Sequence, residues 1–234
     1  MAKAQVAGRT ETGRVRQANE DAFRIYHDSK DLPTQSRGSI FVVADGMGSY
    51  RGAAMAASIA VDQVANYYQV PRIEFQANRT LEQFLFRANE VVADMRKSQK
   101  DYYGMGTTVC AVLTDPSFRQ AFVYYAGDSP VYLFRQGKLL EATHAQVDES
   151  GALTNHVGLG KGFSLEKVKV VIQPGDQCLL CSDGLSGALE QEFIKETLES
   201  CQDASACLDV LVDKALETSR DNITAILLSI EDSP

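Results

Sequence analysis

Residues 39–46 read SIFVVADG, and this stretch sets the pattern for the rest of the chain. The apolar run over 39–44 does not alternate with polar residues, which is typical of a strand covered on both faces. Asp45 comes directly after the run, so its carboxylate is expected at the mouth of a buried strand. Gly46 follows, and a residue without a side chain lets a main-chain carbonyl come close to a bound ion.

Three more aspartates occupy similar places in the sequence. Asp128 follows FVYYAG at 122–127, Asp183 follows CLLCS at 178–182, and Asp221 precedes NITAILL at 222–228. The end of one antiparallel strand lies beside the start of its neighbour, so the carboxylates can share one rim. Clustered carboxylates repel one another unless a cation lies between them, and oxygen ligands suit Mg²⁺, Mn²⁺ or Ca²⁺. Since aspartate is also common in turns, spacing alone leaves a metal site and ordinary turns as open alternatives.

Strands and helices are grouped along the chain. Apolar and turn patterns predict helices over 52–68, 81–97, 191–200 and 204–218, and strands over 5–10, 22–26, 39–44, 107–114, 120–126, 131–135, 138–142, 168–172, 177–181 and 223–230. This grouping indicates an α+β layered domain rather than a strand–helix alternation. No repeat or linker is present in the sequence, so one domain over 1–234 is expected.

The composition restricts the partners and the compartment. The chain has 23 basic and 31 acidic residues, a net charge of −8, which disfavours nucleic acid and anionic membranes as main partners. No membrane-spanning run or signal peptide is recognised, and five cysteines are an odd number, so a reducing cytoplasm is expected. Cys178 and Cys181 have redox spacing, but in a strand they face opposite sides and are interpreted as buried, inert thiols.

Six motifs occur in a fixed order along the chain: TGRVRQANEDAF at 12–23, VADGMG at 43–48, GTT at 106–108, AGDS at 126–129, CSDGL at 181–185 and DNIT at 221–224. Over about residues 5–230 the chain resembles the metal-dependent protein phosphatases (PPM, type 2C), in their bacterial branch. The resemblance implies two stacked antiparallel β-sheets flanked by helices on both sides. It also implies a protein serine/threonine phosphatase with a binuclear Mg²⁺ or Mn²⁺ centre, acting on phosphorylated Ser/Thr proteins in a signalling pathway with a cognate kinase.

The resemblance also implies roles for the metal ligands. Asp45 would bridge both ions, and the Gly46 carbonyl would bind one of them. Asp183 and Asp221 would hold the other ion. Two such ions would activate a water for in-line attack on phosphorus, so no side-chain nucleophile is needed.

Further roles follow from the first motif. Arg16 would clamp the substrate phosphate, since its planar guanidinium offers two parallel donors to phosphate oxygens. Asp21 would hold metal-bound water from outside the ligand set. Met47 stands where some members have a histidine, which leaves metal-bound water as the expected acid for the leaving group.

The chain departs from the family pattern in three places. Gly187 stands where many relatives have a second aspartate, so Asp128 loses a partner, and a third ion should be weak or absent. Asp128 is therefore equally a ligand or a turn residue. Pro130 replaces an arginine and lacks the main-chain N–H, so the local turn should differ.

The flap around 143–162 is the third departure. It is short, and only the motif Gly158-Leu159-Gly160 of the family's flap is recognised. Because loops carry specificity more than catalysis, this change affects the expected substrate more than the reaction. His144 and His156 lie in this loop and are interpreted as surface or turn residues.

The sequence lacks the motifs of two other classes of enzyme. A cysteine-dependent phosphatase needs arginine six residues after the cysteine, and no cysteine of this chain has one; no P-loop motif occurs either. The main alternative is a phosphatase-fold regulatory or binding module with little turnover, which the retained Asp45, Asp183 and Asp221 disfavour. Hydrolysis of small phosphoesters remains a third possibility.

Overall fold

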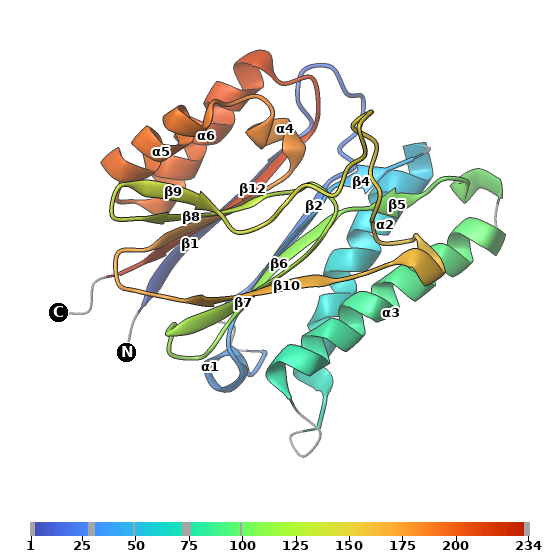
Figure 1. Ribbon diagram of the computed structural model, residues 1–234, viewed down its shortest axis with the longest axis horizontal. Coiled ribbons are helices and arrows are strands. Elements are labelled where there is room, and N and C mark those ends of the chain that lie inside the picture. The colour runs from blue at the N-terminus through green and yellow to red at the C-terminus, as the bar shows by residue number, and fades with distance from the viewer. Residues whose placement is uncertain (1–2, 28–30, 49, 72–75, 99, 232–234) are drawn as a thin grey trace.

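The computed structural model describes residues 3–27, 31–48, 50–71, 76–98 and 100–231. Two five-stranded antiparallel sheets stack on each other (Figure 1). The first sheet has the order β1 (Ala4–Glu11), β12 (Ile223–Ile230), β11 (Gln177–Cys181), β8 (Val131–Arg135) and β9 (Lys138–Glu141). The second has the order β10 (Glu166–Val171), β7 (Gln120–Ala126), β6 (Val109–Thr114), β3 (Ile40–Ala44) and β2 (Ala22–Tyr26). A separate two-stranded ribbon joins β4 (Gly46–Met47) to β5 (Gly106–Thr107).

Helices cover the outer face of each sheet (Figure 1). The first sheet is covered by α5 (Gln191–Ser200) and α6 (Ala204–Thr218), and the second by α2 (Tyr50–Gln63), η1 (Val64–Gln69) and α3 (Ala77–Ser98). The remaining helical segments are short: α1 (Thr34–Arg37), η3 (Lys100–Tyr102), η4 (Gly160–Gly162) and α4 (Asp183–Ser186). This layering confirms the predicted αββα sandwich. Across the described ranges, no helix is both long and apolar enough to cross a membrane.

Strand β3 shows why its sequence does not alternate. Ile40, Val42 and Ala44 pack toward the helices α2 and α3, whereas Phe41 and Val43 pack between the two sheets. All five side chains are fully buried. Because both faces of the strand are covered, an unbroken apolar run is what burial requires.

The predicted elements are all present, half of them with the predicted bounds, but one predicted strand is divided. The run 107–114 forms β5 and β6, because Thr108 leaves the ladder and binds the main chain of Asp45 instead. The predicted helix over 52–68 ends as α2 at Gln63 and continues as the 3₁₀ segment η1.

The cysteines behave as the strand pattern predicts. Cys181 packs toward the helices of the first sheet and Cys178 between the sheets, so the two thiols face opposite sides. All five cysteines are free. Burial raises the pKa of Cys178 to about 12, which keeps that thiol protonated and unreactive at neutral pH.

Candidate metal centre

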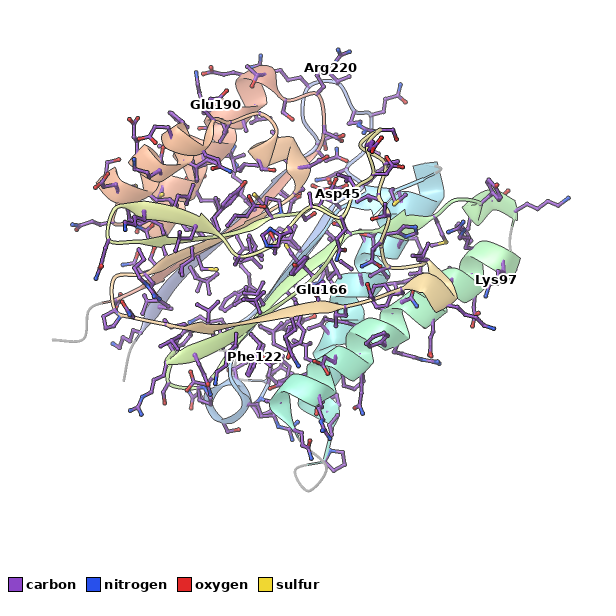
Figure 2. The ribbon with its side chains drawn as sticks, viewed as in Figure 1. Asp45, Lys97, Phe122, Glu166, Glu190 and Arg220 are labelled. Carbon is purple, nitrogen blue, oxygen red and sulfur yellow. The ribbon has the colours of Figure 1, made fainter. Side chains whose placement is uncertain are left out.

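The predicted aspartates gather at one end of the sandwich, where loops from both sheets meet. Asp45 follows β3 and Asp21 precedes β2, so both come from the second sheet. Asp183 begins α4 directly after β11, and Asp221 lies just before β12, so these two come from the first sheet. Figure 2 shows Asp45 between the two layers near this end. The rim therefore belongs to two stacked sheets rather than to one.

Asp21 and Asp45 are half-buried and Asp183 is exposed, but the carboxylates of the rim lie close enough to perturb one another. Burial, followed by the charges of Asp21 and Asp183, raises the pKa of Asp45 well above its ordinary value. Burial also raises the pKa of Asp183, although a hydrogen bond from Asp45 opposes this. The pKa of Asp21 rises to about 6, because burial outweighs the hydrogen bonds from Thr224 and Ser182, the latter 2.9 Å long. Such a group of acids holds protons unless a cation compensates its charge.

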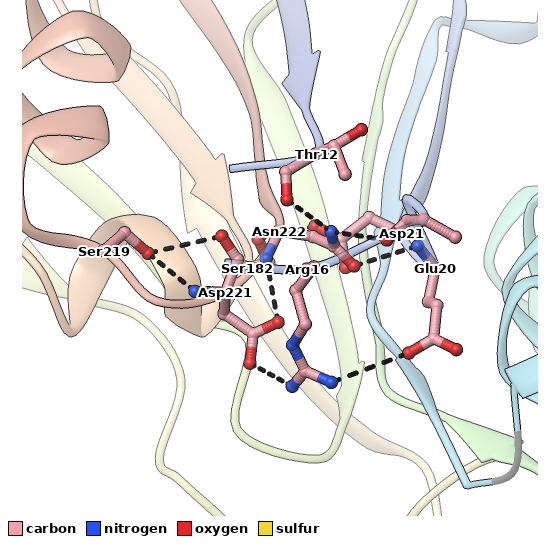
Figure 3. A network of polar contacts seen from close by, with 9 residues as sticks. Thr12, Arg16, Glu20, Asp21, Ser182, Ser219, Asp221 and Asn222 are labelled. Atoms are coloured by element: carbon pink, nitrogen blue, oxygen red, sulfur yellow. Dashed lines mark hydrogen bonds and ion pairs between the residues drawn. The ribbon is translucent and has the colours of Figure 1, made fainter. Parts of the chain in front are cut away.

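Arg16 supplies the nearest positive charge. Its Nη2 lies 2.6 Å from Oδ2 of Asp221, and its Nη1 lies 3.9 Å from Oε2 of Glu20 (Figure 3). The hydrogen bond to Asp221 is the main cause of a raised pKa of Arg16. Within the described residues, no three acidic, histidine or cysteine side chains are already arranged to hold a metal ion. Oδ2 of Asp221 is thus paired with Arg16, and its Oδ1 accepts the N–H of Asn222 at 2.8 Å.

Asn222 holds the turn that carries Arg16. Its Nδ2 donates to the carbonyls of Thr12 at 2.8 Å and Ala18 at 3.0 Å, and its Oδ1 accepts from the N–H of Glu20 at 2.9 Å (Figure 3). The side chain is buried, with 3% exposure, and every bond satisfies a main-chain group of the turn. Sequence reasoning assigned Asn222 no role, although its place in the DNIT motif was the available signal.

The main chain of Asp45 is fixed by two threonines. Its N–H donates to Oγ1 of Thr108 at 3.0 Å, and its carbonyl accepts from the Thr108 N–H at 2.9 Å and the Thr107 hydroxyl at 2.8 Å. Ser129 lies 2.7 Å from the Thr108 hydroxyl and extends the network toward β8. The GTT and AGDS motifs thus meet at Asp45, which their separation in sequence did not reveal.

Gly46 is required by packing as well as by its proposed carbonyl role. A Cβ at this position would lie 2.4 Å from the carbonyl oxygen of Glu20 and 2.5 Å from that of Ala53. No side chain fits between these main-chain atoms. The main chain that follows Asp45 therefore runs directly against α2 and the turn before β2.

Gly187 and Pro130, where the sequence departs from the family pattern, lie near the rim, as does Asp128. Asp128 lies between β7 and β8 and is half-buried; burial, then the charge of Asp183, raises its pKa. Gly187 ends α4 with φ −76°, a conformation open to any residue. Pro130 contributes its carbonyl, which accepts the N–H of Cys181 at 3.1 Å.

The loop over 143–162 contains no α-helix among its residues, all of which are described. His144 is exposed, as predicted. His156 is buried, with 6% exposure, so it is not a surface residue, but it begins a turn in which its carbonyl accepts the N–H of Leu159 at 3.2 Å. Its Nδ1 lies 3.0 Å from the carbonyl of Val157, and burial lowers its pKa. The imidazole fills the space over Gly106, which the absence of a side chain there creates.

Two stacked sheets flanked by helices, with aspartates gathered at one end, are the fold of the metal-dependent protein phosphatases. Residues 35–231 match the family model of Stage II sporulation protein E (SpoIIE), and the chain belongs to that family.

Similar proteins agree with this placement. The serine/threonine phosphatase stp of Listeria monocytogenes is 29% identical over 243 residues, covering 94% of this chain and 93% of the relative. PppA of Pseudomonas aeruginosa, described as a key regulatory component of T6SS, is 27% identical with a TM-score of 0.83, covering 97% of both chains. The catalytic domain of the phosphatase PstP, solved with two manganese ions, shares the fold with a TM-score of 0.83 at 24% identity, covering 99% of this chain and 100% of that one.

Proposed function

We propose that this chain is a metal-dependent protein serine/threonine phosphatase that hydrolyses phosphoserine and phosphothreonine in proteins. The observation that carries the proposal is the pair Asp45 and Asp183, two acids from different sheets that lie close enough for the charge of Asp183 to raise the pKa of Asp45. Acids in this state favour replacement of their proton by a cation. The names of the similar proteins, which are serine/threonine phosphatases, support the same reaction.

The donor set fits two hard divalent ions, Mg²⁺ or Mn²⁺. Carboxylates and a main-chain carbonyl are the oxygen ligands that these ions prefer. We assign Asp45 and the Gly46 carbonyl to one side of the centre, and Asp183 and Asp221 to the other. Ions held there supply a nucleophile from water at neutral pH and neutralise phosphate charge. A third ion would be weak, because Gly187 offers no carboxylate to join Asp128.

The remaining residues of the rim would bind the substrate phosphate and orient a water. Arg16 is exposed at the mouth of the site, and its guanidinium can leave Asp221 to pair with two phosphate oxygens. The turn that carries it stays in place because Asn222 holds three of its main-chain groups. Asp21, fixed by the Ser182 hydroxyl, is placed to orient a water at the rim.

The test is turnover of a phosphopeptide with Mn²⁺, with Mg²⁺ and with a chelator. Asp183→Asn should lower turnover by orders of magnitude, because the nucleophile depends on the ions. Asp94→Asn, which changes an exposed carboxylate on α3, is the matched control and should behave as wild type. Near-wild-type activity of Asp183→Asn at saturating Mn²⁺ would refute the assignment.

The same assay separates the alternatives. A regulatory module would bind Mn²⁺ without turnover, and an enzyme for small phosphoesters would prefer an aryl phosphate to the phosphopeptide. We further propose that residues 1–234 form one domain with a shortened flap at 143–162, acting in the cytoplasm on phosphoproteins of a kinase pathway. The acidic net charge and the continuous pairing of β1 with β12 support this; residues 1–2 and 232–234 lie outside the described residues.

A further inference from the structure

A buried asparagine on α3 holds the shortened flap. Asn89 is 5% exposed, and its Oδ1 accepts the N–H groups of Gly158 and Gly160, each at 3.0 Å. Its Nδ2 donates to the Gly160 carbonyl at 3.1 Å. Both glycines have positive φ, +98° and +79°, so the flap makes a turn here that few other residues would adopt. One amide thus binds three main-chain groups of a loop whose helical structure is limited to the short segment η4.

The segment that Asn89 holds pairs directly with β5. The N–H of Val157 donates to the Thr107 carbonyl at 2.8 Å, and the Thr107 N–H donates to the Val157 carbonyl at 3.1 Å. Gly158, the next residue, is packed so closely that a Cβ would lie 2.6 Å from Cγ1 of Val92 on α3. The flap is therefore clamped between α3 and β5.

Strand β5 in turn supports the proposed ligands. The Thr107 hydroxyl donates to the Asp45 carbonyl at 2.8 Å, and Thr107 pairs with Gly46 in the β4–β5 ribbon. Asn89 is consequently connected to the main chain of Asp45 by its hydrogen bond to Gly158, the peptide bond from Gly158 to Val157, and the hydrogen bonds of Thr107 to Val157 and to Asp45. Asn89, Gly158, Val157 and Thr107 are buried, whereas Gly160, Asp45 and Gly46 are partly buried.

We propose that Asn89 is a positioning residue for the metal centre, acting through the flap to fix the main chain of Asp45 and Gly46. The inference rests on the proposed function. Removing the amide leaves the N–H groups of Gly158 and Gly160 without partners, since the Gly160 carbonyl still accepts the Phe163 N–H, and this favours a change of the turn at Gly158. The Val157–Thr107 pairing then loosens, and the Gly46 carbonyl loses its fixed direction.

The test compares three variants by calorimetric titration with Mn²⁺. Asn89→Ala removes all three bonds and should weaken Mn²⁺ binding by about tenfold, the lower end of the effect of residues that support metal ligands. Asn89→Asp keeps an acceptor for the two N–H groups and should recover part of the loss. Leu81→Ala is the matched control: this residue is fully buried on the same helix and makes none of these hydrogen bonds, so the variant loses core packing and should keep wild-type affinity.

A second measurement does not depend on metal or turnover. In the chelator-treated chain, Asn89→Ala should speed hydrogen exchange at the Val157 and Thr107 amides, while Leu81→Ala should leave their relative protection unchanged. Wild-type Mn²⁺ affinity in Asn89→Ala, or equal weakening in Leu81→Ala, would overturn the role of Asn89 alone. A wild-type chain that neither binds Mn²⁺ nor hydrolyses phosphopeptide would instead refute the proposed function.

Discussion

Arg16 and a metal ion would compete for the carboxylate of Asp221. The substitution Arg16→Ala should therefore have two opposite effects, tighter metal binding and weaker substrate binding. The Arg16–Asp221 pair is 2.6 Å long, but the two side chains are 47% and 37% exposed, so water screens their attraction. An ion pair of this kind is worth about 0.5–1 kcal/mol. Since the ion can use Asp221 only after the pair opens, Arg16→Ala should tighten binding at that site about two- to fivefold.

The same substitution should damage substrate binding. Loss of charge-assisted bonds to phosphate costs about 1.5–3 kcal/mol, so KM for a phosphopeptide should rise by about one to two orders of magnitude. Calorimetry with Mn²⁺ and steady-state kinetics on one preparation measure both effects. Arg14→Ala is the control, because Arg14 lies in the same turn and makes only a 3.5 Å bond to the Glu217 carbonyl. Weaker Mn²⁺ binding in Arg16→Ala with an unchanged KM would show that Arg16 only supports the turn.

Three further predictions concern stability and the third ion. In the metal-free chain, the raised pKa of Asp21, about 6, means that its protonated form stabilises the folded chain below about pH 4, and this contribution, at most about 3 kcal/mol, is lost as the pH rises through 6. In urea unfolding, Asp21→Asn should reduce the loss of stability over this pH range, and the raised pKa values of Asp45 and Asp183 should account for what remains. Asp176→Ala should cost about 3–5 kcal/mol in urea unfolding, because it leaves Arg135 without the two bonds of 2.7 and 2.6 Å that it makes to this buried carboxylate. Gly187→Asp should fold, since φ is −76° there, although its Cβ would approach a main-chain oxygen to 2.9 Å; calorimetry should then detect an added Mn²⁺ step that Asp128→Ala removes.

The elements of this fold could be predicted from sequence because their signals are local. The bounds of β2, β7, β11 and α6 follow from apolar patterns and turn residues that lie within each segment. The position of Asp45 at a strand end could be predicted for the same reason. None of these predictions requires knowledge of which segments meet.

What sequence reasoning missed depends on contacts between distant segments. Arg16 and Asp221 are 205 positions apart, and their pairing follows only from the way β12 is placed beside the first turn. Asn89 and Asn222 look like ordinary polar residues in a helix and a motif until the main-chain groups that they satisfy are known. The burial of His156 could not be predicted, because nothing near it in sequence shows that Gly106 leaves room for an imidazole.

The division of the acidic rim between two sheets has a consequence for the interior of the protein. Asp45 is attached to β3, while Asp183 and Asp221 are attached to β11 and β12. The distance between these proposed ligands therefore depends on the spacing of the two sheets. Side chains packed between the layers, such as Phe41 and Leu180, set that spacing without touching the rim. Substitutions there that change side-chain volume are therefore expected to alter the relative affinities of the proposed centre for Mg²⁺ and Mn²⁺.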